Sequence, residues 1–181
     1  MSTTKGLSEL YNCLNREFWS GELPPIAFFI SFAKTRVTWK IYFKPQYKIS
    51  VHCKLLKSSP EDLYMNMLHQ MVHYGNRIND IKDTSRTDRY HNKKFEEEAK
   101  RVGLILEYTE INGYNPVGIT KQTVKRINKV FDYEQYLKDV EMDDMPEKMY
   151  TYKCPKCNRT VKAFSTNKII CGYCYCDYVL I

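Results

Sequence analysis

The chain has 181 residues, a hydrophobic content of 43% and a formal net charge of +7, so it is long enough for one medium-sized domain and a small second one. The hydrophobic content argues against a disordered chain. No apolar run has the length of a membrane span. Residues 1–13 are polar and lack the apolar region of a signal peptide, so we expect none. Seven cysteines, four of them in two C-x-x-C pairs, favour metal ligands in a reducing compartment over disulfides, and we therefore expect a cytoplasmic protein without a membrane partner.

The charge is unevenly distributed along the chain. Residues 1–131 carry 21 Lys+Arg and 13 Asp+Glu, residues 132–147 carry one and seven, and residues 148–181 carry six and one. The chain therefore consists of two basic regions joined by an acidic one. Basic surfaces favour polyanions, nucleic acid above all, although proteins that bind none can be equally basic.

The N-terminal third predicts one helix followed by three strands. Apolar residues at helical spacing predict a helix over residues 7–19 that stops at Gly21. Segments rich in β-branched and aromatic residues predict strands at 26–33, 37–43 and 47–53. We interpret the aromatic residues of the second strand as core or sheet-face residues rather than a ligand cage, namely Trp39, Tyr42 and Phe43.

The next helix, residues 59–76, organises the whole chain. Its two histidines, His69 and His73, are four residues apart, so both imidazoles lie on one helix face and can bind a single cation. The spacing is that of the motif H-E-x-x-H, in which the histidines hold zinc and the Glu accepts a proton from water. Gln70 stands at the position of that Glu, and a neutral amide cannot accept the proton.

A third ligand is needed, because two histidines at this spacing occur by chance on many helices. Residues 77–89 are polar and without periodicity, which predicts a loop, and a further helix begins near residue 90 and stops at Gly103. His91 lies at the start of that helix, where the loop can bring it back to the first two. We therefore predict the ligands His69, His73 and His91, with water in the fourth position.

Four segments of the chain, taken in this order, resemble the SprT-like metallopeptidase family. They are Leu-Tyr-x-x-Leu-Asn-x-x-Phe over residues 10–18, Gly-Glu-Leu-Pro over 21–24, Leu-His-x-Met-Val-His over 68–73 and Tyr-His-Asn-Lys-Lys-Phe over 90–95. The resemblance extends from about Leu7 to the C-terminus.

The resemblance implies an α+β fold with a zincin-like core, built from an N-terminal helix, a small β-sheet, a metal-binding helix and further helices. It implies a zinc ion held by His69, His73 and His91, and a general base at position 70. It also implies a zinc-binding segment after the core and, as substrates, proteins crosslinked to or associated with DNA. The chain departs from the family only at Gln70, which affects activity and leaves metal binding intact.

Three explanations fit Gln70. It is an engineered substitution that keeps the shape of Glu, or a natural feature of a protein without catalytic activity, or another group such as Glu96 or Tyr90 supplies the base. On the first two explanations we expect little or no peptidase activity from the chain as written, and activity in the Gln70→Glu variant.

Beyond Gly103, residues 104–108 predict a short strand and residues 120–131 a helix with an apolar and a basic side. The basic side is either a solvated surface or a phosphate-binding one, and it consists of Lys121, Lys125, Arg126 and Lys129. The acidic residues 132–147 predict a linker, or a helix extension, that marks a domain boundary.

The C-terminal segment contains the pattern C-x₂-C-x₁₃-C-x₂-C, formed by Cys154, Cys157, Cys171 and Cys174. Two C-x-x-C turns supply the four thiolates of a tetrahedral zinc site, so we predict a structural zinc ribbon with strands at 160–164, 168–170 and 178–181. Cys176 is a fifth thiol that could replace Cys174 as a ligand.

The predicted ribbon combines basic and aromatic residues, a mixture that suits single-stranded nucleic acid, although aromatic residues also form the core of so small a domain. Its basic candidates for nucleic-acid contacts are Lys153, Lys156, Arg159 and Lys162.

Together these observations predict a zincin-like core at residues 1–131, an acidic linker at 132–149 and a Cys₄ zinc ribbon at 150–181. The leading hypothesis is a metallopeptidase with two zinc ions, a protein substrate and DNA, especially single-stranded DNA, as a partner. The alternative is a non-catalytic protein that binds zinc and nucleic acid.

Overall fold

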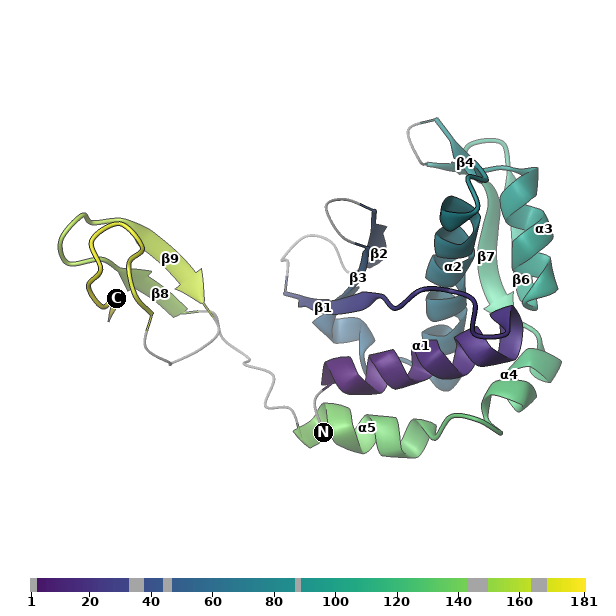
Figure 1. The fold of residues 1–181 in the computed structure, drawn as a ribbon, viewed down its shortest axis with the longest axis horizontal. Coiled ribbons are helices and arrows are strands. Elements are labelled where there is room, and N and C mark those ends of the chain that lie inside the picture. Colours follow the sequence, from purple (N-terminus) through teal and green to yellow (C-terminus); the bar gives the residue numbers. More distant parts are fainter. Residues whose placement is uncertain (1–2, 33–37, 44–46, 87–88, 143–149, 164–168) are drawn as a thin grey trace. The chain divides into compact units, whose positions relative to one another are not determined.

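The computed structural model describes residues 3–32, 38–43, 47–86, 89–142, 150–163 and 169–181. They belong to two compact units, residues 1–143 and 144–181, which we describe separately. The described residues form five α-helices and small β-sheets (Figure 1), which confirms a mixed α+β fold. None of these helices has the length and apolar character needed to cross a membrane.

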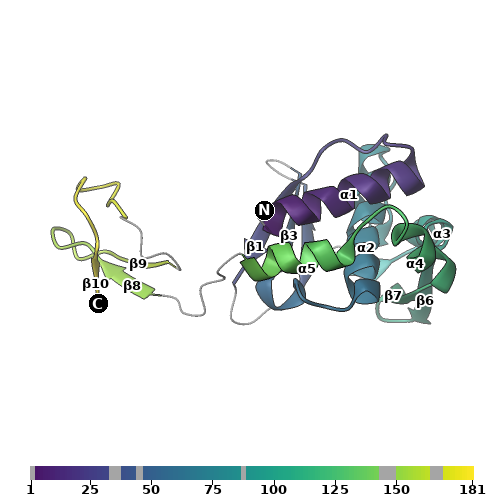
Figure 2. The ribbon, with the colours of Figure 1, turned by 90° about the horizontal axis from the view of Figure 1, so that it is seen from below.

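The first unit contains all five helices and two sheets. Figure 1 shows α2 between the two sheets, and Figure 2 shows α5 alongside α1, with which it is in contact. The helices are α1 (Thr3–Trp19), α2 (Pro60–Ile78), α3 (Lys93–Arg101), α4 (Lys121–Ile127) and α5 (Tyr133–Met142), and a short 3-10 helix covers Cys53–Leu55.

The first sheet has the order β1-β3-β2 and contains β1 (Ala27–Ser31), β2 (Trp39–Tyr42) and β3 (Lys48–His52). β1 runs parallel to the central strand β3, and β2 runs antiparallel to it as an edge strand. Helix α1 contacts β1 and helix α2 contacts β2. Ile49 and Val51 of β3 are fully buried, so one face of this sheet is part of the core.

The second sheet has the order β4-β5-β7-β6, and its main part is the hairpin of β6 (Leu104–Thr109) and β7 (Gly113–Ile119). The short strands β4 (Thr84–Ser85) and β5 (Tyr90–His91) extend it. The sequence predicts a loop for 77–89 and a helix from about residue 90. In the structure His91 is instead on β5, and α3 begins at Lys93.

Helix α2 lies between the two sheets (Figure 1). Its sequence determines both where it begins and which face is buried. Ser59 caps it by accepting a hydrogen bond from the Asp62 amide at 3.2 Å, and Pro60 occupies the first turn. The apolar residues behind this cap are completely buried, and the helix contacts both sheets. They are Leu63, Met67, Leu68, Met71 and Val72.

Helix α5 lies where the sequence predicts an acidic linker or helix extension. Although the segment is acidic, Tyr136 and Val140 are buried, and the Tyr136 hydroxyl donates a hydrogen bond to the Leu56 carbonyl at 3.0 Å. The first unit therefore continues past residue 131, up to about residue 143. Residues 143–149 lie outside the described part of the chain.

The second unit is a three-stranded antiparallel sheet with the order β10-β8-β9. Its strands are β8 (Tyr150–Lys153), β9 (Thr160–Ala163) and β10 (Val179–Leu180). β9 and β10 lie within the segments predicted as strands, whereas β8 is not predicted. Of the predicted strand 168–170, Lys168 lies outside the described residues, and Ile170 forms a single bridge with Asp177.

Candidate metal centres

The three predicted histidines come from two separate elements that the fold brings together. His69 and His73 lie one turn apart on α2, and His91 lies on β5 beside β7. β7 can pair with β5 here only because Gly113 lacks a side chain. A Cβ atom at Gly113 would lie 1.9 Å from the His91 carbonyl oxygen, and its φ of +72° is one that other residues rarely adopt.

The three rings present their Nε2 atoms to one another. The distances between these atoms are 3.0 Å for His69 and His73, 3.2 Å for His73 and His91, and 3.3 Å for His69 and His91. Nitrogens bound at about 2.0 Å to a tetrahedral ion lie about 3.3 Å apart. The three histidines can therefore hold a metal ion with little movement of their side chains.

Phe95 of α3 packs against all three imidazoles and is itself fully buried. Its ring stacks on that of His91 with centroids 4.1 Å apart and planes 19° apart. Asn92 caps α3 through hydrogen bonds to the Lys94 and Phe95 amides, and this cap places Phe95 one turn into the helix. The contact restricts the orientation of the ligand rings.

Asp83 belongs to the candidate histidine site, although the sequence pattern does not single it out. Its Oδ2 atom lies 2.7 Å from Nδ1 of His73 and accepts a hydrogen bond from Asn76 at 3.1 Å. A carboxylate at this position fixes the Nδ1–H tautomer and directs the Nε2 lone pair of the imidazole toward the other rings. The available signal was weak, because Asp83 is one of several acidic residues in a polar loop.

The protein environment keeps the imidazoles of His69 and His91 neutral. Burial, and secondarily His73, lowers the pKa of His91 to about 4. Burial also lowers the pKa of His69 well below its ordinary value, with further contributions from His73 and His91. Neutral imidazoles offer the lone pairs that a metal ion needs.

Gln70 and the three histidines line a cleft of about 930 Å³. β2 borders this cleft, as do basic residues of α2 and of the following loop. Gln70 is only 5% exposed, and its side-chain amide makes no hydrogen bond within the described part of the chain. Neither Glu96 nor Tyr90 is among the residues that line the cleft; Glu96 is paired with Lys100 at 2.6 Å.

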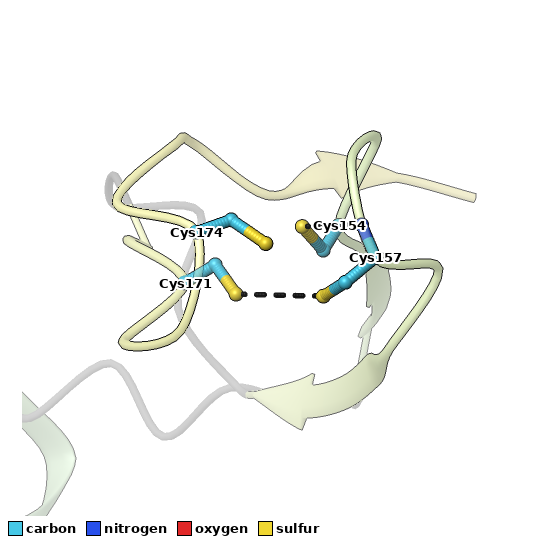
Figure 3. A group of neighbouring side chains, drawn as sticks. All are labelled: Cys154, Cys157, Cys171 and Cys174. Atoms are coloured by element: carbon cyan, nitrogen blue, oxygen red, sulfur yellow. Dashed lines mark hydrogen bonds between the residues drawn. The ribbon is translucent and has the colours of Figure 1, made fainter.

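The second unit holds a group of four cysteines, Cys154, Cys157, Cys171 and Cys174, whose Sγ atoms all lie within 4.8 Å of one another (Figure 3). The Cys157 and Cys171 sulfurs are 3.8 Å apart, the separation expected of thiolates about 2.3 Å from a tetrahedral ion. This group can also hold a metal ion.

The two cysteine turns have matching backbone geometry. The amide of Cys154 donates to the Arg159 carbonyl, and the amide of Cys171 donates to the Cys176 carbonyl, each at 2.8 Å. The backbone N–H of Cys157 lowers the pKa of Cys154 to about 6, and such N–H groups likewise lower that of Cys171. The first cysteine of each turn is therefore favoured as a thiolate, whereas the neighbouring Cys157 thiol raises the pKa of Cys174 to about 12.

Cys176 is outside the group of four. Its Sγ atom lies 3.5 Å from that of Cys154, so the fifth thiol is next to the cluster. The structure groups Cys174, rather than Cys176, with the other three cysteines.

The basic residues predicted to contact nucleic acid differ in their surroundings. On and after α4, Lys121, Lys125 and Lys129 are exposed, whereas Arg126 binds Glu17 at 2.8 Å and stacks on Phe18. In the second unit Lys153 is half-buried, and the Arg159 guanidinium lies 4.1 Å from the centre of the Tyr173 ring. Lys156 and Lys162 are exposed.

Comparison with known proteins gives no match: no family model, no curated protein and no solved structure matches this chain.

Proposed function

We propose that this chain is a zinc-dependent metallopeptidase of the SprT-like type, that it acts on proteins associated with or crosslinked to DNA, and that Gln70 makes it inactive as written. The proposal depends on one observation: the Nε2 atoms of His69, His73 and His91 lie 3.0–3.3 Å apart at a cleft. Three histidines with an open fourth position are typical of catalytic zinc, whereas four cysteines are typical of structural zinc.

The edge strand β2 supports a polypeptide substrate. It pairs with β3 on one side, and its residues 39–42 line the cleft that contains the histidines. An extended peptide can add to such an edge through main-chain hydrogen bonds, which are independent of the peptide's sequence. A peptide bound in this way would pass close to the histidines.

Gln70 determines what this site can do. A bound zinc ion would supply Lewis-acid chemistry. The amide of Gln70 can donate and accept hydrogen bonds, and can therefore orient a water molecule, but it cannot take a proton from it. Loss of a general base lowers rates by about 10²–10⁴, so we expect cleavage to be negligible.

The test compares the chain as written with Gln70→Glu, using an unfolded protein substrate and a protein crosslinked to single-stranded DNA. We expect cleavage only by the Gln70→Glu variant, and loss of that cleavage when His91→Ala is added. Equal cleavage by the variant and the chain as written, or cleavage that survives His91→Ala, would refute the proposal. Comparing the two substrates tests the role of DNA: we expect the Gln70→Glu variant to cleave the DNA-linked protein faster than the free one.

A second candidate function is a non-catalytic protein that binds zinc and nucleic acid, and Gln70 itself favours it. The two proposals differ in metal content and metal chemistry. The peptidase proposal requires two zinc ions per chain, with an exchangeable ligand on the ion held by histidine. The alternative is favoured if there is a single zinc ion, bound by the cysteines, and if Gln70→Glu remains inactive.

A further inference from the structure

One continuous segment of the chain accounts for its whole net charge. Residues 23–60 contain seven Lys+Arg, seven aromatic residues and no Asp or Glu. The other 143 residues contain 21 Lys+Arg and 21 Asp+Glu. Residues 23–60, which include β1, β2 and β3, are therefore a long basic stretch without an acidic residue, whereas the basic residues 148–181 are offset by the acidic residues 132–147.

The structure places part of this charge on the outer face of the β1-β3-β2 sheet. The buried residues Ile49 and Val51 point inward, so Lys48 of the same strand points outward. Its Nζ atom lies 5.3 Å from the ring centre of Tyr42 on β2 and 5.7 Å from that of Phe29 on β1. A lysine thus stands between two aromatic rings on three adjacent strands.

These rings are accessible. Phe29 is 62% exposed and Tyr42 is 37% exposed. Lys40, beside Tyr42 on β2, adds a second cation 5.0 Å from the Tyr42 ring centre. We call these four residues, Phe29, Lys40, Tyr42 and Lys48, the sheet-face cluster.

We propose that the sheet-face cluster binds single-stranded DNA. Exposed aromatic rings stack on unpaired bases, and adjacent lysines neutralise the phosphates between them. A sheet face with aromatic residues on neighbouring strands is one of the ways in which proteins bind single strands. The choice of DNA over RNA rests on the proposed function.

Charge argues for this occupant over others. A second copy of the chain would bring two segments together that both lack acidic residues, and like charges in contact are unfavourable. Duplex DNA offers phosphates, but its bases are stacked inside and cannot cover Phe29 and Tyr42. A single strand offers both groups.

The cluster adjoins the candidate metal site of the same unit. Lys40 and Tyr42 also line the cleft that contains the three histidines. A single strand bound across the sheet would therefore reach the edge of that cleft. A protein attached to the strand would be held near β2, where the proposed function requires it.

The test is binding of a fluorescent oligothymidylate to the full chain, followed by anisotropy. We expect the double variant Phe29→Ala/Tyr42→Ala to weaken binding by at least about tenfold, since each stacked base contributes substantially to affinity. We expect Lys48→Gln to reduce the dependence of log affinity on log salt by about 0.7, the value for one phosphate contact in a single strand.

Two control variants test surfaces outside the cluster. Tyr108→Ala removes a tyrosine that is 53% exposed on β6, and Lys5→Gln/Lys138→Gln removes two exposed lysines, one on α1 and one on α5. We expect both to bind DNA within about twofold of the parent. In every variant, an unchanged circular dichroism spectrum and an unchanged metal content would establish that the fold is intact.

The proposal is overturned if the cluster variants bind DNA as tightly as the parent. It is also overturned if the control variants lose as much affinity for DNA as the cluster variants lose. Tighter binding of duplex DNA or of oligouridylate than of oligothymidylate would also overturn it. The binding assay does not depend on catalysis, so the two proposals can fail separately. If the Gln70→Glu variant binds DNA but cleaves no protein, the peptidase proposal is refuted and the DNA-binding proposal is retained.

Discussion

At the scale of single residues, the chemistry of the histidine site depends on a side chain that does not face the metal position. Asp83 lies 2.7 Å from Nδ1 of His73 and is fixed by Asn76. A carboxylate in this position holds the ring in one tautomer and makes its Nε2 atom a better donor.

We therefore predict that Asp83→Asn weakens metal binding at the histidine site by about 10–100-fold, measured by competition with a chromophoric chelator. Asp80→Asn is the matched control, because Asp80 lines the same cleft without contacting a histidine. A loss of similar size in both variants would mean that general charge, and not the bond to His73, sets the affinity.

The residues of the two candidate metal sites differ in how well the sequence predicts them. His69 and His73 follow from spacing on one helix, and the cysteines follow from two repeated turns, because both patterns are local. His91 follows from its place after a loop, together with the resemblance. Asp83 could not be predicted, because its partner is ten residues away and only the folded loop brings the two together.

At the scale of elements, local patterns predicted the amphipathic helices and the strand β6, but failed for the other three strands of the second sheet. β7 contains Pro116 and two glycines, Gly113 and Gly118, so it shows no alternation of apolar and polar residues. β4 and β5 are two residues long and exist only through pairing with their neighbours. Helix α5 was obscured by its acidic composition, although its buried residues attach it to the first unit.

The pairing of β5 with β7 gives a second prediction. In Gly113→Ala the new Cβ would overlap the His91 carbonyl oxygen, and the φ of +72° would be strained. We expect His91 to be displaced, with at least about tenfold weaker metal binding at the histidine site and a free energy of unfolding lower by about 1–3 kcal/mol.

The control for this variant lies on the same strand. A Cβ at Gly118 would meet its nearest neighbour, Ile105, at an ordinary 3.6 Å, so Gly118→Ala should change neither quantity appreciably. Chemical denaturation and metal competition measure both effects. Unchanged metal binding in Gly113→Ala would show that β7 does not position His91.

At the scale of the whole molecule, the two units have different sources of stability. The first has a large apolar core around α1 and α2. The described residues of the second include only three buried ones, Tyr152, Cys154 and Cys171. So small a core cannot offset the entropy of ordering the chain, and a metal ion held by the four cysteines, which can bind one, would supply the difference.

We therefore predict that a strong chelator unfolds residues 150–181 and leaves the first unit folded. In a two-dimensional amide NMR spectrum, signals of the second unit should collapse to random-coil positions, while those of α1 and α2 remain dispersed. Cys154→Ser should reproduce this result without a chelator, because it removes one of the four thiolates. Helical circular dichroism should change little in either case, since all five helices belong to residues 3–142. Loss of the helical signal in parallel with the second unit would show that the histidine site is needed for the fold of the first unit.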